Sequence, residues 1–383
     1  MISVIVLTHG AGPHLQESLG SLAQQTYRDL EVLVVDDATG NVVTLPDERF
    51  RLVKGGALSR GAGRNLGVRE ARGDHLAFVE DGDRLPPEAL ELLLASLAET
   101  GSDFAAGNVS TITESGDPWR SWTHKEAFAR ELKRTHIRKH KLLLHDRYVT
   151  GKVFRRTFWD AAGLTFPDGG RYEDLAVAIP AHFLAKAVDV LPEMVLHRRL
   201  EINPGLTTEP QDIADGVAAV SSVAQTLAGH WKAAERRRFE LTVLDRELKA
   251  FLDSMPDAEA SERIQIVEQT GAYALNLDPK TFGYLPALTR LKWHLAGRRL
   301  VMELVKVVRY ERGKTSPSIV RNPVRRYVVY PYWKDDKLNI PEDVYRARGE
   351  VRLRSRTQSV EWKDGRLVVT GEAYINSVSM RRR

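Results

Sequence analysis

The first 110 residues alternate short apolar runs with amphipathic stretches. Apolar runs with the length of strands buried on both faces lie at residues 2–7, 31–35, 50–53, 75–79 and 104–109. Between them, Leu15, Leu19 and Leu22 recur at helical spacing, and residues 64–71 and 87–97 have the pattern of further helices. This alternation predicts an α/β domain with a mainly parallel sheet and right-handed crossovers.

The hydrophobic pattern changes twice in the rest of the chain. Residues 210–312 carry apolar side chains at helical spacing, which predicts an all-α region. Near the C-terminus the period becomes two: residues 359–371 predict a hairpin that turns at Asp364-Gly365, and residues 373–375 predict another strand. We therefore expect an α/β domain at 1–207, a helical domain or linker region at 208–340, and a partial, truncated β-rich module at 345–383.

Composition and charge narrow the classes of protein. The chain has no cysteine, which excludes disulfides and thiolate metal sites, and its start has the pattern of a strand rather than a signal peptide. No apolar stretch is long enough for a membrane-spanning helix, so we expect a cytoplasmic protein. The net charge is +5, with basic clusters at 133–156, 232–238 and 290–326. Such clusters attract polyanions, or they are ordinary solvated helix faces.

Two acidic corners follow predicted strands. Asp36-Asp37 ends one apolar run, and Glu80-Asp81-Gly82-Asp83 ends another. In a parallel sheet both corners lie at the same edge, beyond the carboxyl ends of the strands, where ligands bind. Carboxylates there suit Mg²⁺ or Mn²⁺ bound together with phosphates. The alternative is a solvated acidic turn that caps the next helix.

A glycine-rich run, Gly61-Ala62-Gly63-Arg64-Asn65-Leu66-Gly67, lies between the two corners. Its glycines allow the backbone to approach a ligand closely, and Arg64 offers a forked donor for phosphate or a base edge. The run is neither a P-loop nor the dinucleotide fingerprint, because the residues that those motifs require are missing.

Taken together in this order, the motifs resemble the family 2 glycosyltransferases of the GT-A fold. The resemblance rests on the runs 34–38, 63–67, 71–74 and 78–86 and covers about the first 205 residues. Farther along, the runs 150–159, 163–167 and 170–175 are similar to the wall teichoic acid and capsule polymer glycosyltransferases. The resemblance implies a GT-A nucleotide-sugar transferase domain.

The resemblance also implies roles for individual residues. Asp174 corresponds to the catalytic base of that group, which removes the proton from an acceptor hydroxyl. The metal would be held by Asp81 and Asp83. The nucleotide-sugar site would comprise Thr8, His9, Asp36, Asp37, Arg64, Asn65, Glu80 and Asp81. The diphosphate and acceptor side would comprise Glu173, His197, Arg198 and Arg199.

Simpler readings of these residues stand beside the implied roles. An acidic pair such as Glu173-Asp174 also occurs simply at a helix N-terminus, where the helix dipole favours it. Arg198-Arg199 also suits a solvated pair at a domain edge. Gly82 departs from the family, since it stands where the second metal-motif aspartate is expected. Either Asp81 and Asp83 serve the metal in a shifted register, or metal binding is weakened.

The sequence therefore predicts an inverting, metal-dependent glycosyltransferase, with Mn²⁺ or Mg²⁺ as cofactor. We expect a UDP-sugar donor and an acceptor that is a polyanionic envelope polymer, such as teichoic acid or capsule, or its lipid-linked precursor. Peripheral contact with the inner face of the membrane and self-association stay open. One alternative is a catalytically weakened module that tethers a polyanionic polymer or a partner domain. Nucleic-acid binding is disfavoured because no such motif is present.

Overall fold

The computed structural model describes most of the chain. The described residues are 1–8, 13–36, 43–56, 58–112, 118–119, 122–170, 172–199, 209–313, 317–322, 324–348, 350 and 353–375. They form two compact units, one of Met1–Gly205 with Ala218–Arg236 and one of Leu206–Val217 with Arg237–Arg383. His9 and Asp37 lie outside the described residues.

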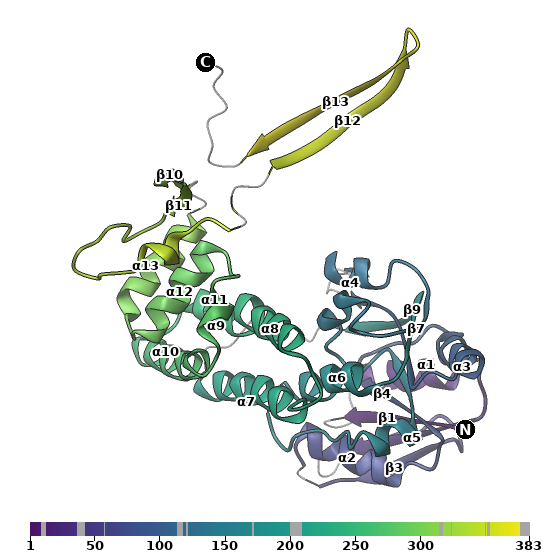
Figure 1. Cartoon of the computed structure of the whole chain (residues 1–383). Coiled ribbons are helices and arrows are strands. Elements are labelled where there is room, and N and C mark those ends of the chain that lie inside the picture. Colours follow the sequence, from purple (N-terminus) through teal and green to yellow (C-terminus); the bar gives the residue numbers. More distant parts are fainter. Residues whose placement is uncertain are drawn as a thin grey trace. The chain divides into compact units, whose positions relative to one another are not determined.

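The first unit, of which Figure 1 labels the strands β1, β3, β4, β7 and β9, is built on a mixed sheet. The sheet has nine strands in the order β3-β2-β1-β4-β8-β5-β9-β7, and β6 pairs with β5. The neighbouring strands β3, β2, β1 and β4 are parallel, as are β5 and β9, whereas β8 and β7 run antiparallel to their partners. The strands are β1 Ile2–Thr8, β2 Leu30–Asp36, β3 Phe50–Lys54, β4 His75–Glu80, β5 Phe104–Ile112, β6 Pro118–Trp119, β7 Leu132–Thr135, β8 Lys152–Arg155 and β9 Val188–Arg199. The predicted α/β class with a mainly parallel sheet is confirmed.

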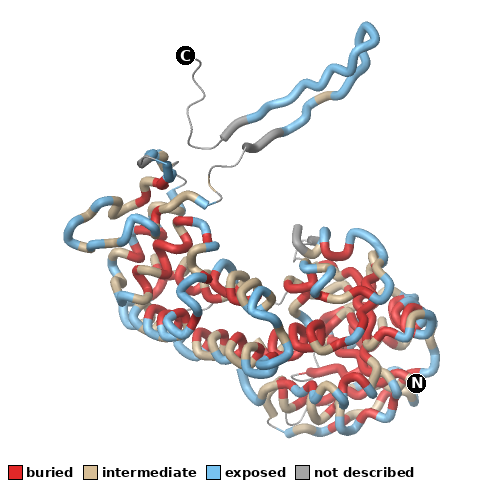
Figure 2. Tube along the Cα trace, viewed as in Figure 1, coloured by how far each residue is buried: buried red, intermediate tan, exposed pale blue. Residues whose placement is uncertain are grey.

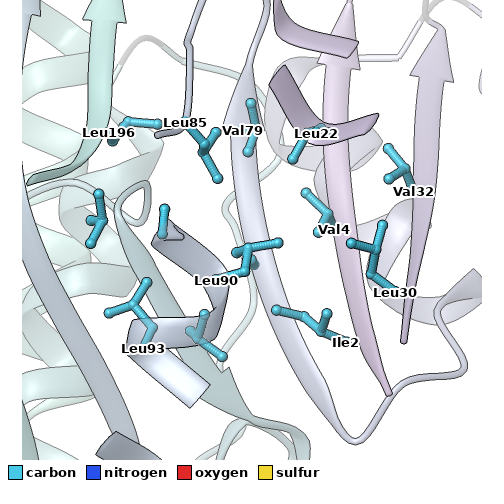
Figure 3. Close-up of a cluster of buried hydrophobic side chains, with 14 of the residues drawn as sticks. Ile2, Val4, Leu22, Leu30, Val32, Val79, Leu85, Leu90, Leu93 and Leu196 are labelled. Atoms are coloured by element: carbon cyan, nitrogen blue, oxygen red, sulfur yellow. The ribbon is translucent and has the colours of Figure 1, made fainter. Parts of the chain in front are cut away.

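Helices cover both faces of this sheet. They are α1 Pro13–Ala23, α2 Arg60–Glu70, α3 Ala89–Thr100, α4 Trp122–Ala127, the 3₁₀ helix η1 Lys141–His145, α5 Arg156–Ala161 and α6 Glu173–Leu184. Successive strand residues point to opposite faces. On one face Ile2 and Val4 of β1 and Val79 of β4 pack in one core with Leu22 of α1 and Leu90 of α3 (Figure 3).

The opposite face of β1 and β2 packs against α2. A Cβ added at Gly67 would lie 2.5 Å from Cγ2 of Ile5, and one at Gly63 would lie 2.7 Å from Cδ1 of Leu7. At Gly61 the obstacle would be the carbonyl oxygen of Pro167, at 1.9 Å. The prediction that these glycines let backbone approach a ligand is therefore wrong, because the close contacts are with the chain itself. They bring α2, and with it Arg64, down onto the sheet.

The second unit is mostly helical, as the pattern predicted. The end of α7 and the start of α8 belong to the first unit. The elements are α7 Pro210–Thr226, α8 Ala233–Thr242, the π-helix η2 Val243–Glu247, α9 Leu248–Ser254, α10 Ala260–Leu275, α11 Pro279–Phe282, α12 Ala287–Gly297, α13 Val301–Arg312, β10 Ser318–Asn322, β11 Arg325–Val329, η3 Glu342–Tyr345, β12 Leu353–Lys363 and β13 Arg366–Ile375. The sequence did not predict the β10–β11 hairpin.

The predicted C-terminal hairpin is present and turns where expected. β12 and β13 pair antiparallel, with Lys363 opposite Arg366. Both turn residues have positive φ, 50° at Asp364 and 71° at Gly365, as a two-residue type I′ turn requires. The separate strand predicted at 373–375 is wrong, since those residues continue β13. The hairpin is exposed along its described length (Figure 2).

Candidate active site

The carboxyl ends of three parallel strands bring the predicted residues to one edge of the sheet. Thr8 of β1 lies in register with Asp36 of β2, and Leu7 of β1 lies in register with Glu80 of β4. The Thr8 hydroxyl donates to Oδ2 of Asp81 at 3.4 Å. The strand ends, and not local sequence, therefore gather the two acidic corners, as the sheet prediction required.

A buried arginine occupies the centre of this edge. The Arg64 side chain is 3 % exposed and forms ion pairs with three carboxylates: Glu80, Glu173 with a separation of 3.2 Å, and Asp174 with a separation of 2.8 Å. Arg60, one helical turn earlier, adds a second guanidinium at 2.5 Å from Glu80 and 3.2 Å from Glu173. The structure thus ties the end of β4 to the start of α6 through two arginines of α2.

The charges of this cluster stabilise one another. Burial opposes the charged form of Arg64, but Asp174, Glu80 and Glu173 outweigh it and raise the pKa of Arg64. Burial likewise opposes the charge of Glu80, yet Arg64 and Arg60 hold its pKa below the usual range. For Glu173 burial dominates and raises the pKa. In the described structure Glu80 and Arg64 are therefore bound to protein groups, and their predicted contacts with the nucleotide stay predictions.

Asp174, the predicted base, is held from two sides at the N-terminus of α6. Its Oδ2 accepts a hydrogen bond from the backbone N–H of Val149 at 3.2 Å, and its Oδ1 lies 2.8 Å from Nη1 of Arg64. The side chain is 17 % exposed, so solvent or a substrate can still reach it. A partly exposed carboxylate in a fixed orientation is what a general base requires.

The 146–152 segment beside Asp174 is itself fixed by a buried charge cluster that sequence reasoning missed. Nζ of Lys152 lies 2.6 Å from Oδ1 of Asp146 and donates to the Tyr148 carbonyl oxygen at 2.6 Å. Nε2 of His182, on α6, lies 2.9 Å from Oδ2 of Asp146. All three titratable side chains are at most 5 % exposed. Lys152 belongs to a run that resembles the family, but no pattern linked it to Asp146 or His182.

The acidic loop after β4 carries the predicted metal ligands. The Asp83 side chain is buried and its Oδ2 accepts from the backbone N–H of Glu80 at 3.3 Å. Burial raises the pKa of Asp83 to about 7, with Arg198 opposing the rise and Glu80 adding to it. Gly82 has φ of 90°, and a Cβ there would lie 3.1 Å from Cδ of Arg199.

This loop can supply at most part of a metal's coordination. Within the described ranges no three carboxylate or histidine side chains are grouped to hold an ion. Mg²⁺ commonly takes one or two carboxylates and completes its shell with water and substrate phosphates. Binding of a cation by Asp81 and Asp83 together with a diphosphate stays a prediction, and Glu80 is occupied by Arg60 and Arg64.

The end of β9 places the predicted diphosphate residues next to this loop. Nδ1 of His197 lies 2.8 Å from the Ser110 hydroxyl, and burial lowers the His197 pKa. The Arg198 guanidinium stacks 3.4 Å above the Tyr148 ring, and its Nη2 donates to the Thr150 hydroxyl at 3.0 Å. Tyr148 and Thr150 flank Val149, whose N–H orients Asp174, so one segment contacts both Arg198 and the predicted base.

The end of the strand and Asn65 are held by the protein as well. Arg199 donates to Oε2 of Glu17 at 2.6 Å. The Asn65 amide donates to the Phe166 carbonyl at 2.8 Å and accepts from the Phe166 N–H at 2.9 Å. Asn65 is therefore a clamp on the segment after α5, and its nucleotide contact stays a prediction.

A comparison with protein families decides the class of this domain. The model of the glycosyl transferase family 2 matches residues 3–161, which include β1 to β8 and the acidic edge. Residues 3–161 therefore have the sequence pattern of a family 2 glycosyltransferase domain.

Curated relatives agree with this family. The chain is 24 % identical over 216 residues to the putative glycosyltransferase EpsH of Bacillus subtilis strain 168, covering 53 % of this chain and 61 % of EpsH. It is 29 % identical over 126 residues to the glycosyltransferase GlyG of Streptococcus pneumoniae, covering 30 % of this chain and 41 % of GlyG. The chain thus spans less than two thirds of the length of these relatives.

Solved structures show the fold over nearly the whole chain. S. aureus TarS matches with a TM-score of 0.73 at 15 % identity, covering 98 % of this chain and 65 % of TarS. TarS 1-349 in complex with UDP-GlcNAc matches with a TM-score of 0.71 at 16 % identity, covering 91 % of this chain and 99 % of that one. The similarity confirms the GT-A-like domain, the helical region and the β-hairpin elements that follow. None of the helices within the described residues is long and apolar enough to cross a membrane.

Proposed function

We propose that this protein is an inverting glycosyltransferase that moves a sugar from a UDP-sugar to a hydroxyl of a cell-envelope polymer, such as teichoic acid or capsule, or of its lipid-linked precursor. The observation that carries the proposal is Asp174, a partly exposed carboxylate oriented by Val149 and Arg64 at the carboxyl edge of a family 2 domain. The fold shared with TarS, solved with UDP-GlcNAc, supports UDP-GlcNAc as the first donor to assay.

In the proposed reaction Asp174 removes the proton from the acceptor hydroxyl as its oxygen attacks the anomeric carbon. The bond from that oxygen to the carbon forms while the bond to the nucleoside diphosphate breaks, so one displacement inverts the anomeric configuration. Arg64 and the Val149 N–H hold the carboxylate in place as it takes up the proton. Arg198, supported by Thr150 and Tyr148, lies near the buried Asp83 and offers a cation for the departing diphosphate.

Asp81 and Asp83 would hold Mn²⁺ or Mg²⁺ in this proposal. Such a cation neutralises negative charge on the leaving diphosphate when it is bound. The polar, oxygen-only donor set of the two aspartates suits either ion.

Asp174→Asn tests the assignment of the base. The amide keeps the shape but cannot accept the proton, so we expect transfer to fall by about 10²-fold or more while UDP binding changes little. Asp160→Asn, at a side chain that is 60 % exposed on α5, is the matched control and should keep wild-type turnover. Turnover by Asp174→Asn at the wild-type rate would rule out Asp174 as the base.

A second candidate is a module that tethers a polymer or a partner domain with weakened catalysis. Gly82, which brings no ligand atom, and Glu80, which is bound to two arginines, favour it. Under this proposal the protein would bind polymer without turning over any UDP-, CDP- or GDP-sugar. Metal-dependent hydrolysis of a nucleotide-sugar would count against it.

A further inference from the structure

A pocket in the second unit is lined mainly by arginines. Its volume is about 520 Å³, and we call it the arginine pocket. Its lining residues are Arg321, Val324, Arg325, Arg326, Arg346, Ala347 and Arg348. They come from the β10–β11 hairpin and from the segment that follows η3, so the pocket lies wholly within one unit.

The backbone sets these arginines close together. Arg321 and Arg326 are directly opposite each other in the antiparallel pair of β10 and β11. The Ala347 N–H donates to the Arg326 carbonyl at 2.9 Å, which lays the third segment beside β11. Like charges directly opposite on neighbouring strands destabilise a sheet unless something compensates them.

A buried arginine holds the segment that carries part of the pocket lining. Arg290 of α12 is 5 % exposed and donates to the carbonyl oxygens of Val344 at 3.1 Å and Leu285 at 3.1 Å, and also to that of Arg346. These bonds fix the segment that carries Arg346. Burial lowers the pKa of Arg290, and Arg348 and Arg346 act in the same direction while Glu350 opposes them.

Protein carboxylates compensate this charge only in part. Asp343 lies 3.7 Å from Arg346, and the Glu350 carboxylate accepts from the backbone N–H of Arg348 at 2.8 Å. Neither Arg325 nor Arg326 has an ion-pair partner among the residues that the structure describes. The pocket therefore holds an excess of guanidinium groups, which bind phosphate oxygens in a forked geometry.

We propose that the arginine pocket binds consecutive phosphodiester groups of the acceptor polymer; this choice of ligand rests on the proposed function. A concave site with guanidiniums on three adjacent segments can contact several phosphates of one linear chain. Base stacking would need an exposed aromatic ring, whereas none of the described residues that line the pocket has a ring and the neighbouring Tyr327 is buried. Insertion into a membrane would need several apolar side chains, and among the described lining residues only Val324 and Ala347 are apolar.

Direct binding to the full-length protein tests the proposal without donor or turnover. The probe is a fluorescently labelled glycerol-phosphate oligomer, followed by anisotropy over a range of salt concentrations. The variant is Arg325→Gln/Arg326→Gln, and the matched control is Arg356→Gln/Arg366→Gln, which removes the same charge from exposed positions of β12 and β13. Arg348→Gln, on the other segment, is an independent variant should the hairpin variant fold poorly.

We expect wild type and the control to bind the oligomer alike. The pocket variant should bind about tenfold more weakly, and the slope of log affinity against log salt should fall by roughly one to two, as expected for two lost phosphate contacts. Equal loss in the pocket variant and the control would overturn the proposal, because it would show a general effect of charge.

Two further probes separate other sources of phosphate. Tighter binding of polyuridine RNA than of the oligomer, abolished by the pocket variant, would assign the pocket to nucleic acid and overturn the proposal. Pocket-dependent binding to vesicles that contain phosphatidylglycerol, without binding to the free oligomer, would assign it to a membrane surface and overturn it too. A protein that binds the oligomer but transfers no sugar would refute the proposed function and leave the pocket's ligand standing.

Discussion

At the scale of single residues, the candidate site depends on Arg64. Its guanidinium is almost fully buried and shared among Glu80, Glu173 and Asp174. Breaking a buried ion pair by removing one partner is costly, because the remaining charges keep their desolvation without compensation. Arg64 is therefore both a structural link and the group that orients the proposed base.

Arg64→Met should lower the free energy of unfolding by about 3–5 kcal/mol, because it leaves three carboxylates without their central cation. Arg60→Met is the matched control. Its side chain is 37 % exposed, so the expected loss is about 1 kcal/mol or less. Urea unfolding of both variants measures the difference. Equal losses would show that the buried arginine is no more important than the exposed one.

Asp83→Ala should abolish the dependence of UDP binding on metal. In our proposal Asp83 is one of only two protein ligands, so its loss leaves the cation with a single carboxylate. Calorimetric titration of UDP with and without Mn²⁺ measures this, with Asp160→Ala as control at an exposed side chain. If wild type binds UDP with the same affinity with and without Mn²⁺, the result would favour the tethering function instead.

At the scale of elements, α2 and α6 determine how the site is assembled. α2 lies close to the sheet because Gly63 and Gly67 leave room for Leu7 and Ile5. α6 is joined to the 146–152 segment at two places, through His182 to Asp146 and through Asp174 to the Val149 N–H. Both contacts link segments far apart in sequence.

Gly67→Ala should destabilise the protein by about 1–3 kcal/mol, because the new Cβ would lie 2.5 Å from Ile5 in a packed core. Gly20→Ala on α1 makes the same change where nothing lies within 4 Å, and should stabilise by about 0.5–1 kcal/mol. Thermal unfolding compares the two. A stabilising Gly67→Ala would mean that α2 does not pack this closely.

His182 should make the stability of the fold depend on pH. Burial lowers its pKa below the usual 6.5. Its Nδ1 has no hydrogen-bond partner among the described residues, so a proton added there would have no acceptor. As pH falls, the unfolded chain therefore takes up this proton before the folded protein does. The contribution of His182 to the free energy of unfolding is complete above about pH 6.5 and declines below it.

The decline from one such group is at most about 1.4 kcal/mol per pH unit. Lys152 and His182 outweigh burial and hold the pKa of Asp146 well below its usual range, so Asp146 adds nothing between pH 6.5 and 5. His182→Asn should have a shallower dependence than wild type in that range, and exposed His230→Asn should match wild type. Parallel curves for all three proteins would contradict the prediction.

At the scale of the whole molecule, the chain returns to its first unit after leaving it. Residues 218–236 belong to that unit, where the Trp231 ring lies 5.8 Å from Phe183 and Arg138 contacts Glu235 at 2.9 Å. A fragment that ends at 205 therefore lacks part of its own packing.

A fragment of residues 1–236 should melt roughly 5–10 °C above one of residues 1–205, because each kcal/mol moves the midpoint by about 2–4 °C in a domain of this size. A fragment of residues 1–217 is the control for length, since it adds none of the returning segment and should melt with the shorter fragment. Thermal melting of the three fragments, followed by circular dichroism, compares their midpoints. A midpoint for residues 1–217 as high as that for residues 1–236 would show an effect of chain length and not of the returning segment.

The sequence by itself determined the local elements. Period and length of the apolar runs predicted the strands β1 to β5 of the sheet, and the Asp364-Gly365 pair predicted the turn of the last hairpin, because these signals lie within a few neighbouring residues. The acidic edge could also be predicted, since parallel strands end on one side. The role of Asp174 as the base was predicted through the family pattern and stays a prediction.

Only the tertiary structure decided the partners. Nothing local shows that Arg64 binds Asp174, that Asn65 clamps Phe166, or that His182 meets Asp146, because each pair joins segments tens of residues apart. The glycine-rich sequence of α2 resembles that of a ligand-binding loop, but in the folded protein its glycines allow the helix to pack closely against the sheet. Burial and neighbouring charges also determine the pKa of each carboxyl group, and these depend on which side chains pack around it in the folded protein.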